Sequence, residues 1–125
     1  VLPTFEAQKS GHVIAVSSVA GLKVYAGAGV YCGTKWAVKA IMEALRMESA
    51  QARTNIRTAT IYPAAVQSEL VDSITDQRTS EGYRALYDTY EIPSERVANV
   101  VAFALNQPED TNVSEFTLGP TTQPW

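Results

Sequence analysis

Three short runs of apolar and β-branched residues, separated by segments with helical periodicity, constrain the fold of this chain more than any other feature. The runs are residues 12–16, 55–62 and 113–118. The first lacks polar–apolar alternation, which is typical of a strand buried on both faces of a parallel sheet. Because parallel strands need crossover connections, this order predicts an α/β fold, a parallel sheet of about three strands with flanking helices.

Helical patterns occupy most of the remaining sequence. Residues 1–10 are predicted to end a helix, with Gly11 as its stop. A second helix is predicted from about residue 30 to 52, and Ser94 is a suitable N-cap for a third that continues to Leu105. Residues 64–92 are polar, with a helix-like opening near residue 69 and no regular pattern after it. We therefore expect a mostly irregular connection there.

The long central helix carries two further signals. Its alanines at positions 37, 40 and 44 form a stripe along which another helix could approach closely. Lys39 and Glu43 are one turn apart and are expected to pair in solvent.

Charge and cysteine content exclude several classes of function. The 125 residues carry a net charge of −3 and no basic stripe, which argues against a nucleic-acid partner. No apolar run is long enough to cross a bilayer. Cys32 is the only cysteine, so neither an intrachain disulfide nor a cysteine-based zinc site can form, and no metal is expected. A reducing, cytoplasmic setting is the expectation.

Ser18, Tyr31 and Lys35 form the constellation most informative about chemistry. Ser18 follows the first predicted strand, at the carboxyl end where open α/β sheets bind ligands. Tyr31 and Lys35 are four residues apart at the start of a helix, so they share one face. An ammonium group near a phenol favours the phenolate, which suits the phenol for proton transfer at a carbonyl or alcohol oxygen. A serine hydroxyl could hold the same oxygen, while hydride would have to come from a cofactor.

The segments Ser17–Gly21 and Tyr31–Lys35 resemble the serine element and the YxxxK motif of short-chain dehydrogenase/reductases. The resemblance implies that Tyr31 is the catalytic acid/base, that Lys35 binds the nicotinamide ribose, and that Ser18 orients the substrate oxygen. Ser17 is then a bystander. The cofactor implied is NAD or NADP, with NADP the favoured choice, and the substrate is a small carbonyl compound or secondary alcohol.

Residues 61–68 resemble the same family's PGxVxT segment, in which Ala64 replaces the usual glycine and Ser68 the usual threonine. The resemblance assigns cofactor contacts to Pro63, Ala64, Val66 and Ser68, besides Tyr31 and Lys35. Ala64 would be unfavourable if this position needed a positive φ. Residues 67–92 correspond to the family's variable substrate-binding loop.

Residues 1–125 as a whole resemble the C-terminal half of one Rossmann-type domain of that family, without its glycine-rich phosphate loop. The opening Val1-Leu2-Pro3 lacks an initiator methionine and a signal peptide, which suggests that the natural start is absent. We expect this chain alone to be inactive, and to self-associate or to have a proteolytic origin. The helix carrying Tyr31 and Lys35 is the expected contact in a homo-oligomer.

Two other classes of function remain open from the residues. A non-catalytic fragment or dimerisation module of the same fold is the alternative. A serine hydrolase is disfavoured, because Ser18 lacks a G-x-S-x-G elbow and His12 is the only histidine. Tyr25 and Tyr62 are interpreted as packing residues, and His12 as a surface or edge residue.

Overall fold

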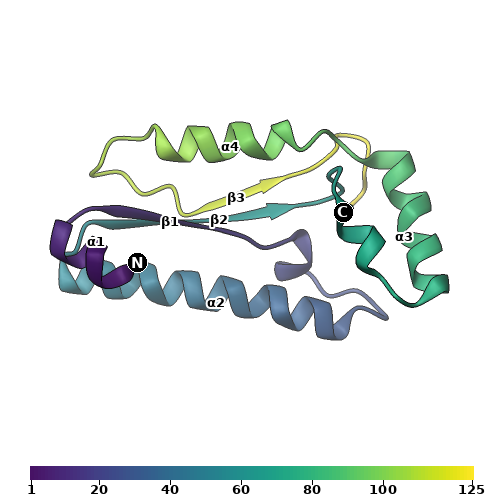
Figure 1. Ribbon diagram of the computed structural model, residues 1–125, viewed down its shortest axis with the longest axis horizontal. Coiled ribbons are helices and arrows are strands. Elements are labelled where there is room, and N and C mark those ends of the chain that lie inside the picture. Colours follow the sequence, from purple (N-terminus) through teal and green to yellow (C-terminus); the bar gives the residue numbers. More distant parts are fainter.

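The computed structural model describes residues 1–125 and contains one parallel sheet between helices (Figure 1). Its strands are β1 (Gly11–Val16), β2 (Ile56–Pro63) and β3 (Glu115–Leu118). They lie in the order β1-β2-β3, and both neighbouring pairs are parallel. The predicted α/β fold with three parallel strands is therefore confirmed, with β3 starting two residues later than expected.

Helices cover both faces of this sheet. Along the chain they are α1 (Leu2–Gln8), the 3₁₀ helix η1 (Val19–Gly21), α2 (Gly29–Ala52), the 3₁₀ helix η2 (Glu69–Ser73), α3 (Gln77–Tyr90) and α4 (Glu95–Leu105). In Figure 1, α2 runs along one face and α4 along the other, while α3 stands across one end of the sheet. None of these helices combines the length and apolarity needed to cross a membrane.

The core is built around the central strand, because β2 is the only strand paired on both sides. Its residues Ala59, Ile61 and Tyr62 are fully buried. At the other end of this strand, the buried Ser49 joins the end of α2 to the start of β2. Its Oγ donates to the Ile56 carbonyl at 2.9 Å and accepts from the Ile56 amide at 3.1 Å. The orientation of α2 on the sheet is thus set by packing and by a buried polar contact.

The expectation of an irregular segment after residue 74 was wrong. Residues 77–90 form α3, which Asp76 caps by accepting from the Thr79 amide at 2.8 Å. Side-chain capping satisfies one of the free amides of the first turn and favours helix formation here despite the polar composition. The D-x-x-T pattern at residues 76–79 is the sequence signal that could have revealed this helix.

The expected Lys39–Glu43 pair was also wrong. Lys39 instead lies 3.6 Å from a carboxylate oxygen of Glu115 in β3, and Glu43 forms a two-pronged ion pair with Arg46 at 2.7 Å. Tertiary packing turns Lys39 toward the sheet, which helix spacing alone does not reveal. The first helix ends at Gln8 and is capped by Lys9, in the left-handed conformation at φ 56°, rather than stopped by Gly11, which begins β1.

Candidate functional site

The carboxyl ends of the strands gather the residues predicted to carry chemistry. Val16 at the end of β1 pairs with Ile61 in β2, and Pro63 at the end of β2 pairs with Leu118. The loop after β1 leads into η1, and α2 begins on the same side of the molecule (Figure 1). The first strand, the second strand and the start of α2 therefore meet at this edge.

The Ser18 hydroxyl is held by a local hydrogen bond in which its oxygen is the acceptor. Ser18 is the N-cap of η1, and its Oγ accepts from the Ala20 amide at 3.1 Å. Because that contact uses only the oxygen lone pair, the hydroxyl hydrogen can donate to another oxygen. The side chain is partly buried beside the strand end. Ser18 is thus a rigidly held donor.

Ser17 was interpreted as a bystander, but it has a structural task. It is 4% exposed, and its Oγ donates to the backbone carbonyl of Lys35 at 3.0 Å. This hydrogen bond links the end of β1 directly to the helical turn that carries Tyr31 and Lys35. Sequence reasoning could not assign this role, because it depends on a contact across eighteen residues.

Tyr31 and Lys35 come together as the helical spacing predicts. The Lys35 Nζ lies 5.6 Å from the centroid of the Tyr31 ring. The same nitrogen donates to the carbonyl of Val16 at 3.5 Å, so it lies between α2 and the end of β1. No carboxylate pairs with Lys35, since the salt bridges of this chain involve other residues. Tyr31 itself is 37% exposed, and its phenol is accessible from solvent.

Ser18 and Tyr31 are not joined by a hydrogen bond. Lys35 connects the two segments instead. Its ammonium group donates to the carbonyl of Val16, and its backbone carbonyl accepts from the Ser17 hydroxyl. The three predicted residues thus lie at one edge of the sheet. An ammonium, a phenol and a free hydroxyl at one edge can bind a polar oxygen and exchange a proton with it.

Tyrosines of α3 extend this site, and sequence reasoning did not identify them. Burial raises the pKa of Tyr87, and the nearby phenols of Tyr31 and Tyr83 raise this pKa further. Burial likewise raises the pKa of Tyr25, with smaller contributions from Cys32 and Tyr83. These mutual effects require that the phenols lie within electrostatic reach of one another. Helix α3 therefore brings an aromatic group to the edge where Tyr31 lies.

The segment after β2 is held by hydrogen bonds to β3 and to Ile92. The Ala64 amide donates to the carbonyl of Leu118 at 2.9 Å, which extends the sheet by one step. The Gln67 amide donates to the carbonyl of Ile92 at 2.9 Å, and the Ile92 amide donates to Ala65 at 3.2 Å. These hydrogen bonds fix the path of the backbone after β2.

Val66 and Ser68 keep unpaired amide groups within this segment. Neither backbone N–H has a partner. Val66 does pair with Ile92 in an isolated parallel bridge, but the hydrogen bonds of that bridge are made by the Ile92 and Gln67 amides. The Ser68 Oγ accepts from the Leu70 amide at 3.4 Å. Ala64 does not have a positive φ, since the non-glycine residues with one are Lys9, Arg53 and Asn55. Alanine in place of glycine therefore costs no left-handed strain.

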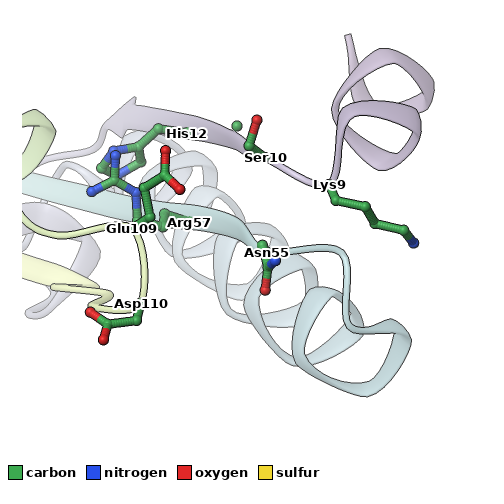
Figure 2. A pocket seen from close by; sticks show the side chains of 8 residues that line it. Lys9, Ser10, His12, Asn55, Arg57, Glu109 and Asp110 are labelled. Carbon is green, nitrogen blue, oxygen red and sulfur yellow. The ribbon is translucent and has the colours of Figure 1, made fainter.

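A polar cavity lies at the opposite end of the strands. It has a volume of about 450 Å³ and no hydrophobic residue in its lining. Figure 2 shows His12, Arg57 and Glu109 grouped together, with Asn55 and Lys9 farther along the wall. The residues of the carboxyl edge do not line it. No group of three or more His, Cys, Asp or Glu side chains is arranged to hold a metal ion.

Comparison with known proteins gives consistent matches over this whole chain. A family described as short chain dehydrogenase matches residues 1–79. An uncharacterized oxidoreductase of Listeria innocua is 64% identical over 125 residues, which are 100% of this chain and 50% of that protein. The chain thus spans about half the length of the curated relatives it matches.

Solved structures show the same relation. Serine dehydrogenase in a closed form complexed with NADP+ superposes with a TM-score of 0.88 at 27% identity, covering 100% of this chain and 50% of that one. Serine dehydrogenase from Escherichia coli gives a TM-score of 0.77 at 26% identity and covers 100% of this chain and 47% of that one. The fold therefore matches one half of these dehydrogenase structures.

Proposed function

The chain belongs to the short chain dehydrogenase family, and from this premise we propose that it carries the catalytic residues of an NAD(P)-dependent oxidoreductase. The proposed reaction interconverts a carbonyl compound and a secondary alcohol. The activity is proposed for the protein at its natural length, since the relatives are about twice as long as this chain. The observation that carries the proposal is the position of the Lys35 ammonium, 5.6 Å from the Tyr31 ring and 3.5 Å from the carbonyl at the end of β1.

Tyr31 acts as the acid/base in this proposal. In the reducing direction its hydroxyl gives a proton to the substrate oxygen, and the phenolate that results is stabilised by the Lys35 ammonium. In the oxidising direction the phenolate takes the alcohol proton. Ser18 donates its free hydroxyl hydrogen to the same oxygen and holds it in position. Each role uses a hydrogen or a lone pair that no other protein group occupies.

The residues present fit a nicotinamide cofactor. Lys35 has no carboxylate partner, so its hydrogens can reach ribose hydroxyls together with the Tyr31 phenol. Val66 and Ser68 offer unpaired amides after β2, and Pro63 and Ala64, which end the pairing of β2 with β3, lead into them. The bound nicotinamide supplies or accepts the hydride. NADP is the favoured cofactor, because the serine dehydrogenase neighbour is complexed with NADP+.

Residues 67–92 are proposed to form the substrate-binding segment. The support is that Tyr87 of α3 lies within electrostatic reach of Tyr31, with Tyr83 of the same helix beside it. Aromatic rings beside a polar pair would bind the carbon skeleton of a small substrate while the pair engages its oxygen. A non-catalytic module would not need this group of tyrosines around an exposed phenol.

A homo-oligomer formed through α2 is proposed as the working assembly. On the face of α2 turned away from the sheet, Ile41 is 66% exposed and Val30 is 87% exposed. The alanine stripe at residues 37, 40 and 44 is also exposed and would let a second copy of α2 pack closely. Apolar exposure of this extent on one helix supports a protein contact.

The test is turnover of the protein at its natural length after substitution of Tyr31. L-Serine with NADP+ and a panel of small secondary alcohols are the starting probes, because the solved neighbours include serine dehydrogenases. Tyr31→Phe removes the proton that is exchanged and should lower kcat about 10²- to 10⁴-fold. Thr4→Val removes an exposed hydroxyl from α1, outside the proposed site, and is the control that should leave kcat unchanged.

Two results would contradict the proposal. One is a Tyr31→Phe variant with wild-type kcat, which would remove the phenol from the mechanism. The other is a wild-type protein that binds a nicotinamide cofactor and turns over none of these substrates in either direction. Lys35→Met provides a second measure, since loss of the ammonium should shift the pH dependence of kcat toward higher pH as well as lower the rate.

A further inference from the structure

The last seven residues of the chain, 119–125, fold back over the segment proposed to bind the cofactor. We name them the C-terminal tail. Gln123 in this tail accepts from the Ala65 amide through its side-chain oxygen, at 2.9 Å. Turns within the tail shape it, since the Gln123 amide donates to Pro120 at 3.2 Å and the Trp125 amide donates to Gln123 at 3.1 Å. The Ala65 amide thus takes its acceptor from a side chain 58 residues away in the sequence.

Gly119 allows the tail to approach this closely. A Cβ added there would lie 2.6 Å from the Cβ of Ala64 and 2.7 Å from the Nε1 of Trp125. Both distances are shorter than atoms tolerate, so only glycine lets the tryptophan and the cofactor segment meet at this point. The same indole ring lies 6.0 Å from the Nζ of Lys23, which follows the turn that carries Ser18. The tail therefore contacts the segment after β2 and lies close to Lys23, just beyond the Ser18 turn.

The contact to Ala65 decides which amide of the segment remains free. The amides of Ala64 and Gln67 are taken by backbone carbonyls, and the Ala65 amide is taken by Gln123. Ala65 is 2% exposed, so without Gln123 its amide would be buried and unpaired. The Val66 amide belongs to the next peptide, whose carbonyl, that of Ala65, accepts from the Ile92 amide at 3.2 Å. A movement of Ala65 that exposed its own amide to another partner would therefore strain this hydrogen bond and turn the Val66 amide.

We infer that Gln123 is a positioning residue, which holds the Ala65 peptide so that the free amide of Val66 faces the nicotinamide cofactor. This inference rests on the proposed function. Gln123 lies outside the motifs that resemble the family's, in a segment for which the sequence predicted no functional role. Because the effect passes through a backbone peptide, loss of the Gln123 oxygen should weaken cofactor binding without removing any group that takes part in proton transfer.

The experiment measures binding of NADPH alone to the protein at its natural length, followed by nicotinamide fluorescence. Gln123→Leu removes the acceptor and should raise the Kd for NADPH about tenfold, a change typical of one buried donor left unpaired. Gln123→Glu keeps an acceptor oxygen at the same reach and should restore binding to near the wild-type value. Thr122→Ala, an exposed neighbour in the tail with no hydrogen bond, is the matched control and should not change the Kd.

A second measurement separates positioning from general destabilisation. Amide hydrogen exchange at residue 65 should become faster in Gln123→Leu, and the Kd should be measured at a temperature where all variants remain fully folded, so that the stability lost with the unpaired amide cannot account for weaker binding. An unchanged Kd for NADPH in Gln123→Leu would overturn the inference, as would weaker binding that Gln123→Glu does not restore. If NADPH binds and follows this pattern while no alcohol or carbonyl compound is turned over, the proposed reaction fails and the role of Gln123 stands.

Discussion

Gly21 offers the sharpest test of how the predicted catalytic residues are held together. A Cβ added at Gly21 would lie 2.6 Å from the Oγ of Ser17 and 2.9 Å from the backbone oxygen of Lys35. These two atoms form the 3.0 Å hydrogen bond that joins the end of β1 to α2. Gly21→Ala therefore forces a methyl group into the contact between the Ser18 turn and the helix of Tyr31 and Lys35.

The cost follows from two contributions. Overpacking against backbone atoms that cannot move away costs about 1–3 kcal/mol. Breaking the Ser17–Lys35 hydrogen bond costs a further ~1 kcal/mol. The free energy of unfolding should then fall by roughly 2–4 kcal/mol. With an unfolding entropy of about 2.1 cal/mol/K per residue, this corresponds to a Tm lower by roughly 8–15 °C for a chain of 125 residues.

The assay is urea and thermal unfolding of Gly21→Ala beside Gly82→Ala. An added Cβ at Gly82, in the interior of α3, meets no atom within 4 Å, so this control should gain about 0.5–1 kcal/mol from helix propensity. The rate of turnover should fall in Gly21→Ala by more than the loss of folded protein accounts for, because Lys35 is displaced relative to Ser18. A Tm equal to that of the wild-type protein would refute the close contact and the reasoning that rests on it.

Three further substitutions test other parts of the structure. Ser49→Ala leaves the buried amide and carbonyl of Ile56 without their side-chain partner and should lower the free energy of unfolding by about 1–3 kcal/mol, measured by urea titration. His12 has a pKa below 6.5 because of burial and then the Arg57 charge, so its contribution to stability is present above that pH and is lost as the pH falls below it. The drop in Tm between pH 7.5 and 5.5 should therefore be smaller in His12→Asn than in wild type. Ile41→Glu should shift the mass found by light scattering from oligomer to monomer, and an unchanged mass would place the interface elsewhere.

Strands and the long helix could be predicted because their signals are local. The apolar run at residues 12–16 and the helical spacing of residues 30–52 need no knowledge of distant neighbours, and both elements are present. The same is true of Tyr31 and Lys35, since a four-residue step on a helix fixes which side chains share a face. The expected cytoplasmic setting stays a prediction, as do the site roles.

Contacts between distant residues could not be read from the sequence. Ser17 shows this for the site, because its hydrogen bond to Lys35 depends on how η1 packs on α2. His12 shows it for the fold: it lies on the edge strand β1, as expected, but the sequence did not reveal that both its ring nitrogens are inaccessible and unpaired. Helix α3 was missed for a different reason. Its N-cap signal is local, but the polar composition of residues 64–92 was given more weight than the cap.

Tyr62 shows how the interior connects the two parts of the proposed site. It was interpreted as a packing residue, and it is fully buried, but its hydroxyl also donates to Glu115 at 2.6 Å. Burial, with help from the Glu115 carboxylate, raises the Tyr62 pKa, so the phenol stays a donor. Glu115 in turn lies 3.6 Å from Lys39, one turn beyond Lys35 on α2. This chain of contacts ties the helix of the acid/base pair to β2, whose end leads into the cofactor segment, and to β3, whose end leads into the C-terminal tail. The two parts of the site are therefore connected, because a shift of α2 would break the Lys39–Glu115 ion pair and a shift of the end of β2 would break the partly buried Tyr62–Glu115 hydrogen bond.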